Sequence, residues 1–127
     1  MKNLKTIAII TAVVAMGGLA AAQSTDPKPF LGDWKGTISI MGANLEIGLH
    51  FKLDDAKKVM GTFDSITQGA MGLPVGAIEI KDKTITFKLS GIPGDPTFKG
   101  ALDATGKKLA GDFTQGGAAG TFSVDKQ

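Results

Sequence analysis

Strict alternation of apolar and polar residues is the feature that most constrains the fold of this 127-residue chain. In the clearest run, Leu45–Leu53, every second residue is large and apolar, and the residues between them include Glu46, His50 and Lys52. Successive side chains of a β-strand point to opposite faces of a sheet. The run therefore predicts a strand with one buried face and one exposed face.

The same alternation recurs along the rest of the chain after residue 33. It predicts further strands over Trp34–Ile40, Val59–Phe63, Val75–Ile80, Ile85–Leu89, Phe98–Leu102, Leu109–Phe113 and Ala118–Val124. The strands begin about 10 to 15 residues apart, a spacing that is typical of all-β sandwiches and barrels. The sequence thus predicts an antiparallel all-β domain of about eight strands.

Turn-forming residues separate the predicted strands. Gly42-Ala43 and Gly116-Gly117 have the composition of two-residue hairpin turns. Short loops are expected over Asp55–Lys58, Lys81–Lys83 and Asp103–Lys107, and two longer loops over Ser65–Leu73 and Ser90–Pro96. These connections are short enough for each strand to pair with the next one along the chain.

Five glycines recur two residues before a large apolar residue, so that they share the buried face: Gly36, Gly61, Gly100, Gly111 and Gly120. Glycine weakens a strand unless the fold needs the space that a side chain would occupy. A small, tightly curved barrel has that need. The pattern favours a small antiparallel up-and-down barrel, or a strongly curved sheet, over weak hairpin strands of a flat sheet.

The first 22 residues have the pattern of a signal peptide. Lys2 and Lys5 precede the apolar run Ile7–Ala22, which ends in three alanines, and cleavage is expected before Gln23. The alternative is an uncleaved anchor, but 16 residues are short of the about 20 that a spanning helix needs. The predicted organisation is a signal peptide over 1–22, a flexible leader over 23–29 and one barrel-like domain over 30–127. We expect an exported protein, either periplasmic or secreted.

Charge and cysteine content exclude several classes of protein. All 14 basic residues are lysines, and removal of the signal peptide leaves 12 lysines against 12 acidic residues. Nucleic-acid binding, which relies on a basic surface, is therefore not expected. The chain has no cysteine, so it has neither disulfides nor an N-terminal cysteine for lipid attachment. We expect no association with a membrane once the signal peptide is removed.

The segment Phe30–Gly36, with Gly32 and Trp34 two residues apart, resembles the opening of the calycin barrels, which include lipocalins and fatty-acid-binding proteins. The resemblance implies that the Trp34 indole plugs one end of the barrel and that Phe51, Phe87 and Phe113 line the interior. Calycins typically stack an arginine on this indole. Because this chain has no arginine, Lys108 or Lys126 would have to replace it.

A second resemblance covers about residues 30 to 125. The motifs that carry it are Gly32–Gly36, Gln68–Ala70 with Gly72–Val75, and Gly111–Gly116. In this order they resemble the small β domain that precedes the catalytic domain in many exported bacterial α/β-hydrolases. Because the resemblance covers that β domain alone, we expect no hydrolase activity from it.

The residues give no indication of catalysis. His50 is the single histidine and is expected on a solvated strand face, and no GxSxG string is present to hold a serine nucleophile. Glu46 and Glu79 are expected to point outward from strands, and Asp54-Asp55 is better explained as a turn than as a calcium site. We therefore expect no enzyme, no metal site and no cofactor.

Two functions remain open. The first is an accessory or protein-interaction module, for which the predicted loop Ser65–Leu73 supplies Thr67, Gln68 and Met71 as candidate binding residues. The alternative is a calycin-like barrel that binds a small apolar ligand in its interior. Seven aromatic side chains would occupy much of that interior, which favours the first function. The expected partner is accordingly an unknown protein or a small apolar molecule.

Overall fold

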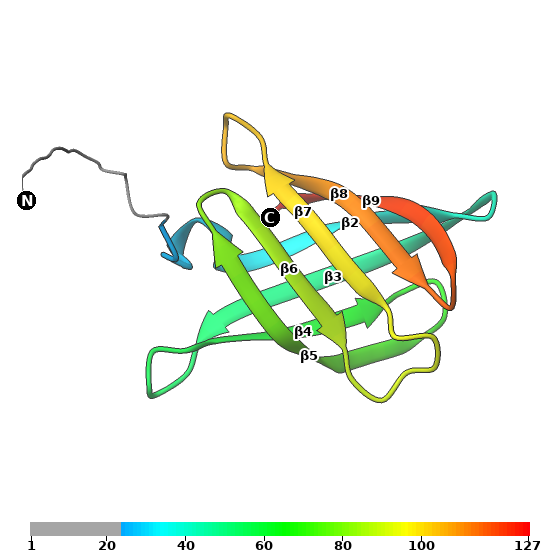
Figure 1. Ribbon diagram of the computed structural model, residues 1–127, viewed down its shortest axis with the longest axis horizontal. Coiled ribbons are helices and arrows are strands. Elements are labelled where there is room, and N and C mark those ends of the chain that lie inside the picture. The colour runs from blue at the N-terminus through cyan, green and yellow to red at the C-terminus, as the bar shows by residue number, and fades with distance from the viewer. Residues whose placement is uncertain (1–23) are drawn as a thin grey trace, which may run out of the picture.

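The computed structural model describes residues 24–127, and within them the chain folds into a closed barrel of eight antiparallel strands (Figure 1). The elements are η1 (Lys28–Phe30), β2 (Gly32–Ile40), β3 (Ala43–Leu53), β4 (Val59–Ser65), β5 (Ala70–Lys81), β6 (Thr84–Leu89), β7 (Thr97–Leu102), β8 (Lys108–Gln115) and β9 (Ala118–Lys126). No helix in this part of the chain is long and apolar enough to cross a membrane. The predicted signal peptide, residues 1–22, lies outside the described residues.

The barrel has up-and-down connectivity. Each strand pairs antiparallel with the next one in sequence, and β2 also pairs with β9, from Trp34 opposite Lys126 to Ile40 opposite Gly120. This last ladder closes the sheet and leaves no free edge. The predicted all-β fold of about eight strands is confirmed, as is the preference for a curved barrel over a flat sheet.

Aromatic rings fill the middle of the barrel. Phe98 is their centre: its ring centroid lies 4.7 Å from that of Phe87, 4.8 Å from Phe113, 5.1 Å from Phe122 and 5.6 Å from Phe63. The structure also buries Phe51, whose ring meets that of Phe87 edge to face at 5.4 Å. Aromatic side chains therefore fill the centre of the barrel interior.

The five recurring glycines lie where neighbouring backbone or a core ring approaches the strand closely. A β-carbon added to Gly36, Gly111 or Gly120 would overlap a backbone carbonyl oxygen of a strand that packs against it. At Gly61 and Gly100 the added atom would meet a phenylalanine ring at 2.9 and 2.6 Å. These positions are glycines because a paired strand or a core ring comes too close for any side chain.

Gly111→Ala is expected to destabilise the protein by roughly 2 to 3 kcal/mol, because the new methyl group would overlap the Lys99 carbonyl and no rotamer relieves a backbone clash. Gly76→Ala is the matched control. Its β-carbon would meet only the Ser90 hydroxyl, at 3.2 Å, and a side chain can move away. Urea titration measures both variants. Equal stability of the two would show that close approach of the strands does not explain the glycines.

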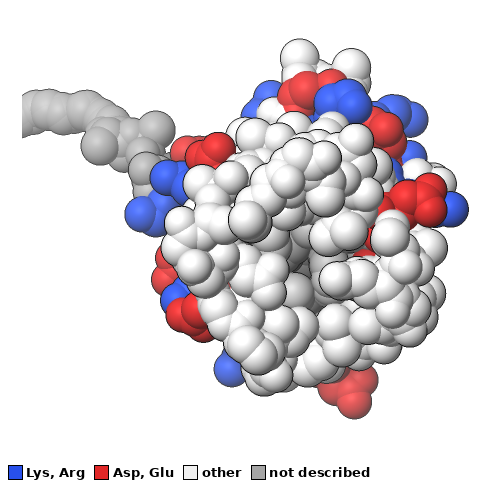
Figure 2. Space-filling model, turned by 90° about the vertical axis from the view of Figure 1, so that its right-hand side faces the viewer, with Lys and Arg blue, Asp and Glu red and all other residues white. Residues whose placement is uncertain are grey.

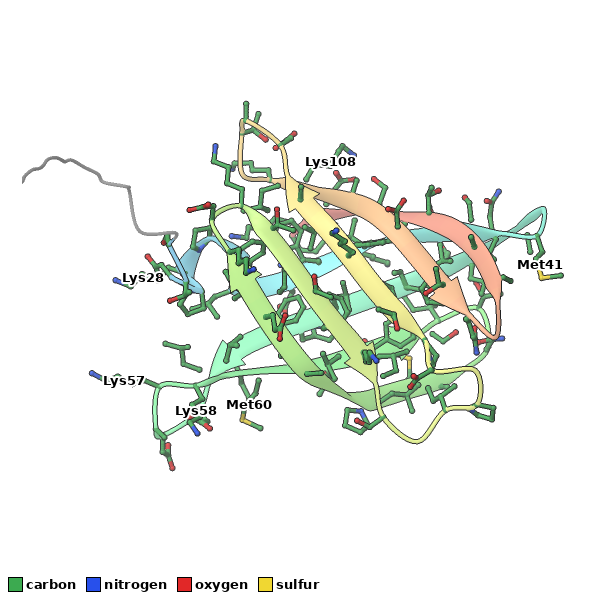
Figure 3. The ribbon with its side chains drawn as sticks, viewed as in Figure 1. Lys28, Met41, Lys57, Lys58, Met60 and Lys108 are labelled. Carbon is green, nitrogen blue, oxygen red and sulfur yellow. The ribbon has the colours of Figure 1, made fainter. Side chains whose placement is uncertain are left out.

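One end of the barrel is closed by η1 and the first residues of β2. Phe30 and Trp34 are both buried there, and the indole N–H of Trp34 donates a hydrogen bond of 2.9 Å to the Phe30 carbonyl. The ammonium of Lys126 lies 5.2 Å from the centre of the indole and donates to the Pro29 carbonyl at 3.2 Å. Of the two lysines that the sequence offered as partners for the indole, Lys126 lies over it, whereas Lys108 points to the outer surface and pairs with Asp125 (Figure 3).

Two predicted connections are placed differently in the structure. The first hairpin turns at Met41-Gly42, where both residues have positive φ, and not at Gly42-Ala43. The predicted loop Ser65–Leu73 shrinks to residues 66–69, because Gly69 has a φ of +72° and lets β5 begin at Ala70. The predicted loop Ser90–Pro96 is confirmed. The described part of the leader is held to Asp82, whose backbone N–H and carboxylate both bond to Ser24.

Candidate ligand-binding site

The two ends of the barrel differ in charge. The connections at the end closed by Trp34, residues 54–58, 82–83 and 103–107, all carry lysines and aspartates. At the other end, residues 41–42, 66–69 and 116–117 carry no charge, and residues 90–96 contain only Asp95. Figure 2 shows this second end as a hollow ringed by uncharged residues, with the charged residues at the periphery. We call this end the barrel mouth.

A cavity of about 300 Å³ opens at the barrel mouth. Its walls and floor are formed mainly by apolar side chains: Ile38, Leu45, Phe63, Leu73, Leu89 and Phe113. Phe63 and Phe113 belong to the aromatic cluster around Phe98, so this cluster limits the depth of the cavity. Ile92 and Pro96 of the β6–β7 loop complete the rim.

Three uncharged polar side chains line the cavity. Ser65, at 3% exposure the one buried polar side chain within residues 24–127, donates a hydrogen bond of 2.7 Å to Oε1 of Gln68. Gln115 donates from Nε2 to the Pro93 carbonyl at 3.1 Å. Gln68 and Gln115 thus sit at the cavity with their amides partly satisfied, on the β4–β5 turn and on β8.

The β4–β5 turn is fixed by the neighbouring hairpin. The backbone N–H of Glu46 donates to Oγ1 of Thr67 at 2.7 Å, and the N–H of Ile66 donates to the Glu46 carbonyl at 2.9 Å. These bonds tie the turn to β3 and therefore hold Gln68 against the cavity. A held side chain loses less conformational freedom when a ligand binds.

The three predicted binding residues differ in their position relative to the cavity. Gln68 lines the cavity, Thr67 anchors the turn through its hydroxyl, and Met71 is 61% exposed and does not line the cavity. Of the predicted interior residues, Phe113 forms part of the cavity floor, while Trp34, Phe51 and Phe87 pack elsewhere in the core. Gln115 and Ser65 were not predicted as binding residues, although the place of Gln115 before the Gly116-Gly117 turn puts it at the same end of the barrel as Gln68.

A second cluster lies on the outer wall of the barrel. His50 on β3 stands between two carboxylates, with Nδ1 2.7 Å from Oδ1 of Asp33 on β2 and Nε2 2.7 Å from Oδ2 of Asp64 on β4. The other oxygen of Asp64 accepts the N–H of Gly72 on β5 at 2.8 Å. The imidazole is expected on the solvated face of its strand, and it does face outward there, 42% exposed. The carboxylates on both sides could not be predicted from the alternation.

The two carboxylates favour a protonated imidazole. Hydrogen bonds from His50 to Asp33 and then to Asp64 raise the pKa of the histidine above its usual value. For Asp64, partial burial alone raises the carboxyl pKa, but the hydrogen bonds from Gly72 and His50 outweigh burial and lower it. Since both ring nitrogens face carboxylates, the cluster joins neighbouring strands of the wall.

Stability is expected to fall as the pH rises above about 6.5, the usual pKa of histidine in an unfolded chain. The folded-state pKa of His50 is raised, so its contribution is complete below the unfolded pKa and disappears as the pH passes the folded pKa. The check compares urea midpoints at pH 5.5 and 8.5 for the wild type and His50→Gln. The decrease should be smaller in the variant, and an equal decrease in both would contradict the ion-pair account.

Other hollows of the surface are less suited to bind an apolar ligand. A larger groove of about 790 Å³ lies at the opposite end between the leader and β5, and Lys57, Glu79 and Lys81 line it together with Ile78 and Val59. Lys57 extends from the β3–β4 turn into solvent (Figure 3). The groove is thus charged, whereas the barrel mouth exposes mainly apolar side chains. Within residues 24–127 no group of three or more histidine or acidic side chains is arranged to hold a metal ion.

Comparisons of the chain with protein-family models, with curated proteins and with solved structures found no match.

Proposed function

We propose that the protein is an exported, non-catalytic barrel that binds a small apolar molecule in its mouth. The observation that carries the proposal is the apolar cavity of about 300 Å³ above the aromatic floor of Phe63 and Phe113. An eight-stranded barrel has room for its own side chains or for one small ligand. In this barrel the aromatic rings fill the centre of the interior, and the cavity lies at the mouth.

The size of the cavity restricts the ligand. Ligand pockets range from roughly 300 to 1,000 Å³, so this cavity is at the lower limit. If each heavy atom takes a volume similar to that of one water molecule, about 30 Å³, the cavity accepts about ten heavy atoms. A compact molecule, or one end of a longer molecule, fits this volume, but a whole long-chain fatty acid does not.

The proposal is also supported by the resemblance of Gly32-Asp33-Trp34 to the opening of the calycin barrels. Members of that group bind small apolar molecules inside the barrel, and they plug the opposite end with a tryptophan. Trp34 and Lys126 provide such a plug here. The resemblance to the β domain of exported α/β-hydrolases is compatible with the same barrel and remains a prediction.

Binding of 1-octanol, a probe of nine heavy atoms, tests the proposal. Isothermal titration calorimetry on the purified protein is expected to show saturable binding that Ala70→Phe removes, because Ala70 lines the cavity and a larger side chain would fill it. Ala101→Phe is the control, since it adds the same ring at an exposed position on β7. Absence of binding to the wild type, or equal binding to both variants, would overturn the proposal.

A second candidate function, an interaction module, is favoured by Met41. This residue is 86% exposed at the tip of the β2–β3 hairpin, which projects beyond the barrel mouth (Figure 3). Its φ of +51° suits glycine, asparagine or aspartate, which are preferred in two-residue hairpin turns. An exposed methionine in this conformation does not stabilise the fold, and a contact with a partner would explain it.

Met41→Asn is expected to raise the stability of the protein by about 1 kcal/mol, because asparagine tolerates the left-handed conformation better than other side chains. Thermal unfolding measures this gain. If the hairpin tip docks a partner protein, the same variant should also lose a cross-linked product that the wild type forms in its own compartment. An unchanged set of cross-linked products would exclude Met41 as a contact.

A further inference from the structure

We infer that the barrel mouth selects a neutral ligand with one hydrogen-bonding group, such as an alcohol, over an ionised carboxylic acid of the same length. The inference rests on the proposed function and adds the chemical class of the ligand. It follows from three properties of the mouth: the absence of charge in the cavity, the polar atoms at Gln68 and Gln115, and the position of the nearest charged residues.

The cavity offers no partner to a carboxylate. None of its lining side chains is charged, and its polar side chains are Ser65, Gln68 and Gln115. Transfer of an ionised carboxylate from water to apolar surroundings without a counter-charge is strongly unfavourable. An anionic ligand would therefore have to keep its head group outside the mouth, and it would lose contact with the rim amides.

The charged residues nearest the mouth do not supply a counter-charge for a carboxylate. Asp95, in the β6–β7 loop, is the one acidic residue in the connections at this end. Its carboxylate lies 3.7 Å from the ammonium of Lys88 on β6, so Lys88 already has an acidic partner. Within residues 24–127, the connections at the mouth contain no lysine that would attract an acid.

The two rim amides suit a hydroxyl group. Oε1 of Gln68 accepts from Ser65, which leaves its Nε2 as a donor, and Nε2 of Gln115 donates to Pro93, which leaves its Oε1 as an acceptor. Among the described residues, neither of these remaining atoms has a hydrogen-bond partner. A hydroxyl group can both donate and accept, so an alcohol can satisfy a donor and an acceptor that are already present at the cavity.

Calorimetry with 1-octanol and sodium octanoate at pH 8 tests the inference, because octanoate is fully ionised there. We expect 1-octanol to bind at least about ten-fold more tightly, as the carboxylate lacks a counter-charge. Equal affinities, or tighter binding of octanoate, would overturn the inference and leave the proposed function intact. If neither probe binds, both the inference and the proposed function fail.

A charge-adding variant tests the same inference from the opposite direction. Gln68→Lys places an ammonium at the rim and is expected to increase octanoate affinity about ten-fold or more, because an opposite charge stabilises the carboxylate. Met71→Lys is the matched control, since it adds the same charge nearby at a residue that does not line the cavity. Thermal unfolding verifies that both variants are folded. An equal gain in both variants would overturn the placement of the ligand head group at Gln68.

Discussion

Replacement of Trp34 by alanine is expected to destabilise the protein by about 3 to 5 kcal/mol, the usual effect of removing a large buried aromatic side chain. The indole is 1% exposed and closes one end of the barrel together with Phe30. Its loss removes a hydrogen bond to the Phe30 carbonyl and the surface over which Lys126 lies. A loss of this size is a large fraction of the stability of an ordinary domain.

Trp34→Phe is the control for this prediction. Phenylalanine keeps an aromatic ring but lacks the N–H that donates to Phe30, so part of the packing is retained. We expect Trp34→Phe to be clearly less destabilising than Trp34→Ala in urea titration. If Trp34→Ala costs less than about 1 kcal/mol, a value ordinary for exposed positions, the indole does not close the barrel.

Replacement of Phe98 by alanine is expected to cost a similar amount, about 3 to 5 kcal/mol. Phe98 is fully buried and its ring packs against Phe63, Phe87, Phe113 and Phe122, so truncation leaves a void at the centre of the core. Because Phe63 and Phe113 form the floor of the mouth, the void lies directly behind that floor. The same substitution should therefore deepen the cavity.

A longer probe distinguishes this account from simple loss of stability. In Phe98→Ala, 1-dodecanol is expected to gain affinity relative to 1-octanol, because the deeper cavity accepts a longer chain. Phe51→Ala is the matched control, since it removes an aromatic ring that contacts Phe87 but does not line the mouth. If the two variants show the same ratio of affinities for the two probes, the void behind the floor does not join the cavity.

The strands and the curvature were predictable because both depend on local patterns. Alternation over Leu45–Leu53 reports which face is buried, whatever the partner strand is. The five glycines on the apolar face indicate curvature, because glycine at a buried strand position mainly allows a neighbouring strand or a core side chain to come close. Gly111 and Gly120 show this directly, since a side chain at either would overlap a carbonyl of the strand packed against it.

The outer His50 cluster could not be predicted, because it depends on register. A turn at Gly42-Ala43, as the sequence suggests, would pair His50 with Lys35, whereas the actual turn at Met41-Gly42 pairs it with Asp33. The difference of one residue in the turn shifts the pairing by two residues. Side chains stay on the same face, but each gains a different neighbour. Alternation cannot distinguish the two registers, because both keep the same side chains on the same face. The composition of the turn favoured Gly42-Ala43 over the actual turn at Met41-Gly42.

The candidate site was only partly predictable for a related reason. Gln68 was identified because it lies in the predicted loop Ser65–Leu73. Ser65, at the start of that loop, and Gln115, before the Gly116-Gly117 turn, carry no local pattern that indicates a binding site. They meet at the mouth because β4, β5 and β8 all end or begin at the same end of the closed barrel. A cavity shared by distant strands becomes visible only when the order and closure of those strands are known.

The most direct test of the binding mouth is an NMR titration of the protein with 1-octanol, in which backbone amide shifts are followed residue by residue. The account predicts saturable changes that cluster at the mouth, around Leu45, Gln68, Ile92 and Gln115, and no changes at Asp82 or Lys107 at the closed end. The absence of saturable changes, or changes confined to the charged groove around Glu79, would contradict it.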